Sequence, residues 1–215
     1  MTFSIVARCA TTPLYGVAIA SSSPAVAARC AHASAGVGAV ATQSMADPRL
    51  GSRILERLAR GLPAHAALHG ALSGTKFEAY RQVLVVGAQG PPEVHSGSRA
   101  LGVAGSAIGA HCAAAGNLLA HGDVPAAMVA AFEATAGQFG DRLLQALRAG
   151  AERGGEAGPI HSAGLLIVRE LSWPIVDLRV DWSMKPLAAL ATIWDIYAPQ
   201  IEDYVRRALD PERAP

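Results

Sequence analysis

Short runs of β-branched and small residues recur along this chain, and segments with helical spacing follow them. The first two runs, Phe3–Arg8 and Gly16–Ser21, flank a turn that contains Pro13, so they predict a β-hairpin. A sheet built of such hairpins has an apolar face that must be covered by helices or by another sheet. The pattern therefore predicts an α+β fold in which two packed sheets lie between helices, a four-layer αββα sandwich.

The other elements follow from the same periodicities. Asp47 followed by Pro48 predicts the start of a helix, and apolar residues at helical spacing continue it to Gly61. Further helices are predicted at 64–72, from Asp123 onward with interruptions near Gly137 and Gly140, and at 186–209 with a kink at Pro199. Further strands are predicted at 36–43, 81–87, 92–96, 163–168 and 175–180, with strand character at both ends of 101–119.

Length and composition exclude several classes of protein. The 215 residues fit one domain, 1–215. With 16% charged residues and a formal net charge of +1, the chain has no basic tail or acidic block that would indicate nucleic acid or a membrane surface as a partner. Cys9, Cys30 and Cys112 lack a CxxC spacing and predict free thiols in a reducing compartment. The start lacks a signal-peptide pattern, so we expect a cytoplasmic protein.

A hydroxyl residue, Thr2, stands directly behind the initiator methionine and ahead of the first apolar run. If Met1 is trimmed, as happens in chains whose second residue is small, Thr2 becomes the N-terminus. Its hydroxyl is then a nucleophile, and its own α-amine, whose pKa is ordinarily about 7.7–8.0, is the general base. This is the chemistry of an N-terminal nucleophile hydrolase. The alternative interpretation is an ordinary first strand.

Several segments carry a resemblance to a known family: MTFSIVARCATTPLYGVAIASSSPAVAARCAHASAGVGAVATQSMADPRLG at the start, then AAAGNLL, HSAGLLIV, VDLRVDW and YAPQIEDYVRRALDP. As a set they resemble the bacterial family catalogued as domain of unknown function 1028, which is grouped with the N-terminal nucleophile hydrolases. The resemblance implies the αββα fold and hydrolysis of an amide bond. The chain departs from the family at Cys9, where many relatives have Asp, and at Ser21-Ser22-Ser23, where they have Lys or Arg. A mechanism with a lysine beside the nucleophile is therefore not expected.

An N-terminal threonine needs neighbours that hold its hydroxyl and donors that stabilise an oxyanion. Ser21 and Ser22 end the strand predicted to pair with the one that begins at Thr2, so one of these hydroxyls could reach the nucleophile; otherwise they belong to a polar turn before Pro24. Gln43 ends the glycine-rich strand where related hydrolases use a backbone amide as oxyanion donor. Its side chain or the neighbouring amides could serve, or it simply closes a loop.

Three further polar residues are candidates. Asn117 is a lone amide among small and apolar residues, costly to bury without partners, although Gly-Asn is also a common turn. The family pattern favours an active-site role for it. Ser162 opens an apolar strand where related hydrolases place a serine near the nucleophile, and a strand-entry serine is the alternative. His161 could act as a base but is interpreted as structural.

We expect no metal and no cofactor. The seven histidines are interpreted as offering neither an HxxxH-type nor an HExxH ligand pair, and no GxxxxGK[ST] motif is present. The predicted function is hydrolysis of a small non-peptide amide, cyclic imide or acylated amino acid by Thr2. The alternative is a non-catalytic small-ligand-binding or scaffold protein on the same fold. The low charge and a terminal helix bearing Trp and Tyr predict a homodimer or higher homo-oligomer.

Overall fold

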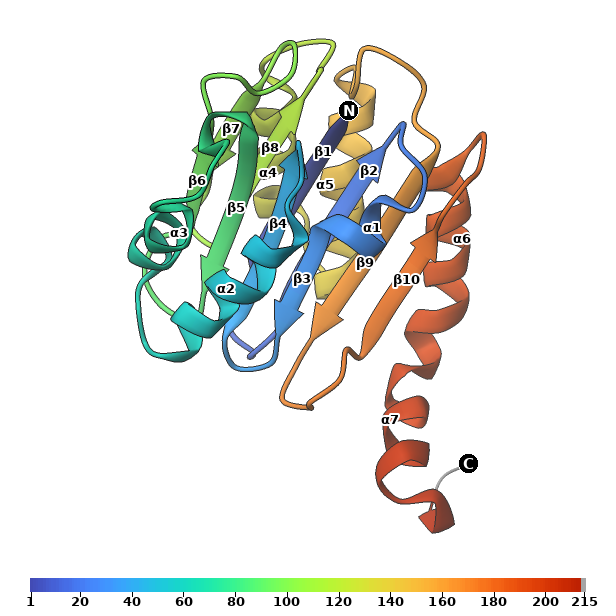
Figure 1. The fold of residues 1–215 in the computed structure, drawn as a ribbon. Coiled ribbons are helices and arrows are strands. Elements are labelled where there is room, and N and C mark those ends of the chain that lie inside the picture. Colours follow the sequence, from blue (N-terminus) through green and yellow to red (C-terminus); the bar gives the residue numbers. More distant parts are fainter. Residues whose placement is uncertain (214–215) are drawn as a thin grey trace.

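The computed structural model describes residues 1–213 and shows a mixed α+β fold with two antiparallel sheets (Figure 1). The larger sheet has the strand order β10-β9-β2-β1-β8-β7. Its strands are β1 (Thr2–Arg8), β2 (Tyr15–Ser21), β7 (Gly105–Ile108), β8 (Cys112–Asn117), β9 (Ser162–Val168) and β10 (Val176–Val180). The smaller sheet has the order β3-β4-β5-β6. Its strands are β3 (Ala31–Ser34), β4 (Gly38–Ser44), β5 (Arg81–Gly87) and β6 (Glu93–Ser96).

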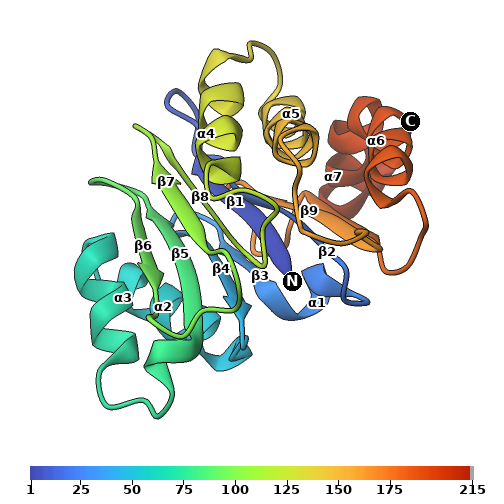
Figure 2. The ribbon, with the colours of Figure 1, turned by 90° about the horizontal axis from the view of Figure 1, so that it is seen from above.

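The helices lie mainly on the outer faces of the two sheets, as the view from above shows (Figure 2). The larger sheet carries α4 (Val124–Ala134), α5 (Phe139–Glu152) and α6 (Pro186–Tyr197). The smaller sheet carries α2 (Pro48–Ala59) and α3 (Ala64–Leu72). The short α1 (Val26–Cys30) follows β2, and α7 (Ile201–Leu209) continues α6 after a 3-10 turn at Ala198–Gln200.

Apolar side chains form three clusters that follow this arrangement. One joins the outer face of the larger sheet to α4, α5 and α6, with Phe3 and Ile5 at its centre. A second lies between the two sheets and includes Val6 and Leu84. The third joins the smaller sheet to α2 and α3. Because β1 contributes to two clusters through alternate residues, both of its faces are buried, and the strand reads as a continuous apolar run.

Most predicted elements are confirmed within one or two residues. The first hairpin forms as expected, with Phe3 opposite Ala20. Asp47 caps α2 by accepting a hydrogen bond from the Arg49 amide at 3.1 Å. A 3-10 turn that contains Pro199 interrupts the terminal helix where a kink is predicted. Among the described residues, no helix combines the length and apolar composition needed to cross a membrane.

Three predictions are wrong in detail. No element is predicted directly before Gly36, yet α1 and β3 lie there; the alanine-rich sequence lacks the β-branched residues that mark a strand. In the 101–119 segment the strand predicted at the C-terminal end is β8, but the strand predicted at the N-terminal end begins only at Gly105, as β7, which pairs with β8. Gly137, with φ +110°, does separate α4 from α5, but Gly140 lies within α5. There a Cβ would collide with the Trp194 ring, so Gly140 is a packing glycine.

Candidate functional site

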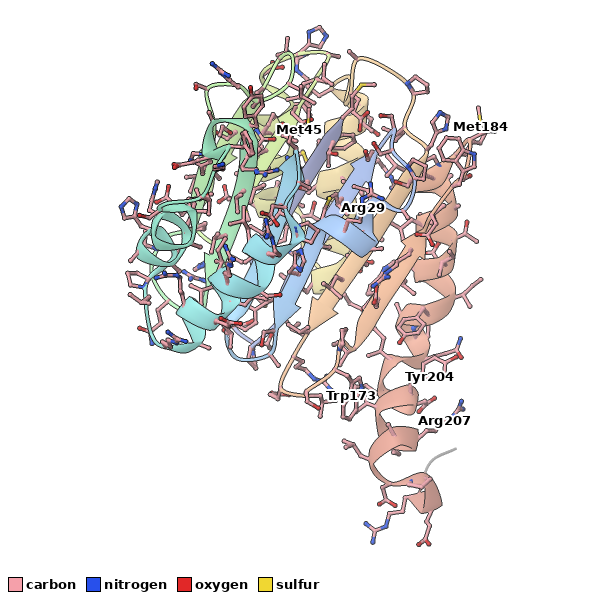
Figure 3. All side chains as sticks on the ribbon, viewed as in Figure 1. Arg29, Met45, Trp173, Met184, Tyr204 and Arg207 are labelled. Carbon is pink, nitrogen blue, oxygen red and sulfur yellow. The ribbon has the colours of Figure 1, made fainter. Side chains whose placement is uncertain are left out.

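A pocket of about 360 Å³ opens at the N-terminal end of β1. Thr2 lines it together with residues from β2, α1, β4 and the loop after β4. Figure 3 places the labelled Arg29 and Met45 near this end of the sheets. Segments that are far apart in the sequence therefore meet around the one residue that the sequence singles out as a nucleophile.

The layer between the sheets becomes polar at this end. Successive strand residues point to opposite faces, so Thr2 and Ser4 face the same layer as Val6. The neighbouring strands do likewise, each placing a polar residue in this layer near Thr2. We call the whole set the inter-sheet polar cluster: Thr2, Ser4, Ser21, Gln43, Gln82, Asn117 and Ser162. All seven side chains are buried. Five of the six predicted site residues belong to it; the exception is Ser22.

Thr2 and Ser21 contact each other directly. The Thr2 hydroxyl lies 3.2 Å from Ser21 Oγ, and both hydroxyls also donate to the Met1 carbonyl oxygen. Ser21 Oγ in turn accepts a hydrogen bond from the Ser23 amide at 3.0 Å. The hairpin register brings this about, since Thr2 and Ser21 are the next pair after Phe3 and Ala20. With Met1 in place, Thr2 is covered and only 6% exposed.

Gln43 sits at the centre of a hydrogen-bond network between the sheets. Its Nε2 donates to Gln82 Oε1 at 2.7 Å and to the Ala115 carbonyl at 3.1 Å, and its Oε1 accepts from Ser4 Oγ at 2.6 Å. Both side-chain N–H groups are thus occupied. A Gln43 side chain in this position braces the sheets, which leaves main-chain amides such as that of Ser44 as the candidates for an oxyanion donor.

Asn117 lies opposite Thr2 in the β1–β8 ladder. Its Nδ2 donates to Gln82 Oε1 at 3.3 Å. Its Oδ1 is buried and has no hydrogen-bond partner among the described residues. A buried acceptor without a partner costs about 1–3 kcal/mol, so a hydrogen-bond donor that reached Asn117 Oδ1 would stabilise the folded protein.

The remaining candidates lie one step further from Thr2. Ser162 pairs with Ser21 in the sheet, but its hydroxyl donates to the Ser23 carbonyl at 2.6 Å and accepts from the Val26 amide at 3.3 Å, so it ties down the turn after β2. His161 stacks on Trp182 with ring centroids 4.3 Å apart. Within residues 1–213, the polar partner of its ring is the Ser183 carbonyl and not Thr2, in keeping with the structural interpretation.

Sequence reasoning missed a buried carboxyl, Glu156. It is 5% exposed and accepts hydrogen bonds from the Ser22 amide at 3.0 and 3.1 Å. Burial raises its pKa to about 7, while the hydrogen bonds from Ser22 and the positive charge of the chain's N-terminal amine act in the opposite direction. Glu156 lies in a glycine-rich loop where no periodicity marks a buried residue. Ser22, one of the predicted residues, therefore acts here through its main chain.

Backbone strain gathers at the same end of the molecule. Four described non-glycine residues have positive φ, and three of them border the site: Ala25 before α1, Ser44 after Gln43, and Leu118 after Asn117. A non-glycine residue in this region costs on the order of 1–3 kcal/mol, and such residues cluster at functional sites. The fold therefore holds the ends of β4 and β8 in conformations that ordinary strand endings do not need.

The pocket wall is positively charged. Arg29 and Arg81 line it, and no Asp or Glu is among its described lining residues. The Arg29 guanidinium donates to the Pro24 carbonyl at 2.7 Å and Arg81 donates to the Met45 carbonyl, so both side chains are held near the opening. Neither Lys76 nor Lys185 lines this pocket. Cys9 follows the opposite end of β1, about 20 Å away for a seven-residue strand, so that departure from the family pattern leaves the surroundings of Thr2 unchanged.

Comparison with known proteins places the chain among relatives without an assigned activity. The profile of a family of unknown function (DUF1028) matches residues 2–190. The crystal structure of protein SPO2555 from Silicibacter pomeroyi, assigned to the same family, is similar over 94% of both chains, with a TM-score of 0.86 and 29% sequence identity. No curated protein matches.

Proposed function

This chain belongs to the family of unknown function DUF1028, and we propose that it is an N-terminal nucleophile hydrolase that cleaves a small amide through Thr2. The observation that carries the proposal is the Thr2 hydroxyl on a pocket wall, 3.2 Å from Ser21 Oγ, at the polar end of an otherwise apolar layer. The proposal includes the four-layer αββα sandwich of that superfamily. Three separate apolar clusters, one between the sheets and one under each helical layer, support it.

Removal of Met1 is the step that would activate the site. It frees the Thr2 α-amine and takes away the carbonyl that occupies both hydroxyls. The new amine can then donate to the unpartnered Asn117 Oδ1, the residue opposite Thr2 in the ladder. A hydroxyl, its base and an acceptor that orients the base would lie together.

The reaction then follows from these groups. The Thr2 hydroxyl gives its proton to the α-amine while its oxygen bonds to the substrate carbonyl carbon. Main-chain amides near Ser44 would stabilise the oxyanion. The C–N bond breaks as the ammonium returns the proton to the leaving nitrogen, which produces an ester on Thr2. A water activated by the same amine hydrolyses that ester and releases the acid. Ser21 would hold the Thr2 hydroxyl in position throughout.

The positive charge of the pocket narrows the choice among the expected substrate classes. Arg29 and Arg81 attract a carboxylate, and the pocket volume of about 360 Å³ suits a small molecule. Among the three expected substrate classes, an acylated amino acid therefore fits best, with its carboxylate toward the guanidinium groups.

The test combines a mass measurement with a substrate panel. The intact mass of the purified protein should correspond to a chain that starts at Thr2. That protein should release free amine from N-acyl amino acids faster than from the matching N-acyl amino amides, which lack the carboxylate. An active enzyme that retains Met1 excludes the mechanism, while a trimmed protein that hydrolyses no panel member favours the alternative, a small-ligand-binding or scaffold protein.

We further propose a cytoplasmic homodimer. The last two helices expose several apolar side chains, namely Ile193, Ile196, Tyr204 and Leu209. Figure 3 shows Tyr204 on α7, which extends away from the sheets. Pairing of two chains through this surface would cover it. Light scattering should report a dimer at micromolar concentration, and a purely monomeric protein contradicts this part of the proposal.

A further inference from the structure

A second group of chemically active side chains lies between α3 and β6, apart from the pocket. His65 and His69 come from α3, and Glu93 comes from β6. One ligand atom from each of these residues can be chosen so that all three lie within 4.8 Å of one another. None of the three lines the pocket around Thr2. We call this group the α3–β6 triad.

The sequence does contain a signal for this group, and the interpretation of the histidines as lacking an HxxxH pair is wrong. His65-Ala-Ala-Leu-His69 is such a pair, and residues four apart on a helix share one face. The buried Ala67 and Leu68 fix which face of α3 meets the smaller sheet. On β6, Val94 packs into the core between the sheets, so its neighbours Glu93 and His95 point the opposite way, toward α3.

The distances are close to those of a bound divalent cation. His65 Nδ1 lies 3.0 Å from Glu93 Oε2, and the His65 and His69 ring centroids are 4.4 Å apart. In tetrahedral zinc coordination the ligand atoms are about 3.3 Å apart. Since the three atoms lie within 4.8 Å of one another, the third atom needs to move by at most about 1.5 Å. That atom belongs to His69, whose exposed side chain is free to make the adjustment.

Neighbouring groups leave this arrangement open for a metal. His95 stands edge-on to His69 with centroids 6.4 Å apart, and its Nε2 is engaged by the Glu78 carbonyl at 3.2 Å. It therefore borders the triad without competing for its centre. Two imidazoles and one carboxylate are a ligand set typical of zinc, with a fourth position left for water.

We propose that the α3–β6 triad binds one Zn²⁺ ion through His65, His69 and Glu93. The ion would fasten α3 to β6, the edge strand of the smaller sheet. Because metal binds only where both elements are folded together, binding should raise the melting temperature. The zinc site shares no residue with the proposed hydrolase site, so the two proposals can be tested separately.

The experiment uses tag-free, chelator-treated full-length protein titrated with Zn²⁺ by calorimetry, together with thermal melts at each step. Wild type should bind one equivalent and melt at a higher temperature with Zn²⁺. His65→Ala, His69→Ala and Glu93→Gln should each weaken binding about ten-fold or more and lose the thermal shift. His121→Ala, at another exposed histidine, is the matched control and should behave as wild type.

Circular dichroism of each variant checks folding, which the exposed positions of His65 and His69 should preserve. Two results overturn the proposal. One is wild-type protein that binds less than half an equivalent of Zn²⁺. The other is a His65→Ala or His69→Ala variant that folds and binds Zn²⁺ as tightly as wild type.

Discussion

The layer between the two sheets has an apolar end and a polar end, although the same strands contribute side chains to both. Toward the far end of β1 it is filled by Val6, Val17, Ile19, Leu84 and Val86, all fully buried. Toward Thr2, the next inward positions of the same strands are hydroxyls and amides. Alternation along each strand assigns both sets to one layer, so the change from apolar to polar is a property of position along the strand and not of a different element.

The difference separates what holds the fold from what the site needs. The apolar end gains stability simply by excluding water from aliphatic groups. The polar end must satisfy each buried group individually. Gln43 and Gln82 do so between the sheets, while main-chain groups bond the hydroxyls of Thr2, Ser21 and Ser162. The exceptions are informative. Asn117 Oδ1 has no partner within residues 1–213, and Ser44 holds a strained backbone conformation.

The largest effect is expected at Thr2. Thr2→Ala should lower kcat/KM by about 10³-fold or more, because it removes the atom that bonds to the substrate, while the melting temperature changes little. Thr2→Ser keeps a hydroxyl and should retain part of the activity. Hydrolysis assays of both variants, each confirmed by intact mass to lack Met1, provide the measurement. Full turnover by the alanine variant would assign the nucleophile elsewhere.

The next effect belongs to the apolar end. Leu84→Ala should lower the free energy of unfolding by about 2–5 kcal/mol, since it opens a cavity among close-packed side chains. Activity measured below its melting temperature should stay close to that of wild type. Urea unfolding monitored by fluorescence gives the first quantity. Loss of activity in a fully folded Leu84→Ala protein would mean that the two ends of the layer are not separable.

The sequence predicts a contact in this layer best when the two residues lie in segments that are adjacent along the chain. The contact between Thr2 and Ser21 follows from a hairpin whose strands and turn are adjacent in sequence. The sequence therefore narrows the neighbour of Thr2 to the serines at the end of β2 but does not single out Ser21. The bracing role of Gln43 is not predictable in this way, because its partners Ser4, Gln82 and Ala115 come from three other strands and two sheets. Gln82 does carry one signal, a lone amide on the inward face of an apolar strand.

Some features have no usable signal. Glu156 is buried only because its loop folds against β8 and the start of the chain, which no periodicity reveals. The alanine-rich segment that forms α1 and β3 carries neither helical nor strand patterning strong enough to identify it. Of these segments α1 lines the pocket, and Glu156 accepts a hydrogen bond from the amide of Ser22. Tertiary contacts and not local propensity decide their conformation.

A smaller effect is expected at the polar end itself. Ser4→Ala removes the 2.6 Å hydrogen bond to Gln43 Oε1 and leaves that buried oxygen without this donor. The free energy of unfolding should fall by about 1–3 kcal/mol, less than for Leu84→Ala. Urea unfolding under identical conditions compares the two variants. A Ser4→Ala protein as stable as wild type would show that water replaces the lost hydroxyl and that this end of the layer is wetter than its burial indicates.

The smallest effect is a change in how the free energy of unfolding depends on pH, caused by Glu156. Because burial raises its pKa from 4.5 to about 7, the folded protein holds this proton more tightly than the unfolded chain does. The stability contribution is present at low pH and is lost as the pH rises from 4.5 to about 7. The glutamine of the Glu156→Gln variant stays neutral. Residue 156 should therefore cause no decline in the stability of this variant over the same pH window. Urea unfolding at intervals across the window measures the difference.

Glu156→Gln also tests whether the Thr2 α-amine is the general base. The activity of the proposed hydrolase should rise with pH as the Thr2 amine, whose pKa is ordinarily about 7.7–8.0, becomes neutral. An ionised Glu156 nearby favours the ammonium form, so Glu156→Gln should move this acid limb of kcat/KM to lower pH. His161→Ala is the control, since its ring stacks on Trp182, and it should leave the limb in place. If His161→Ala abolishes the limb and Glu156→Gln does not move it, the general base is the imidazole, and the polar end of the layer works by a different mechanism from the one proposed.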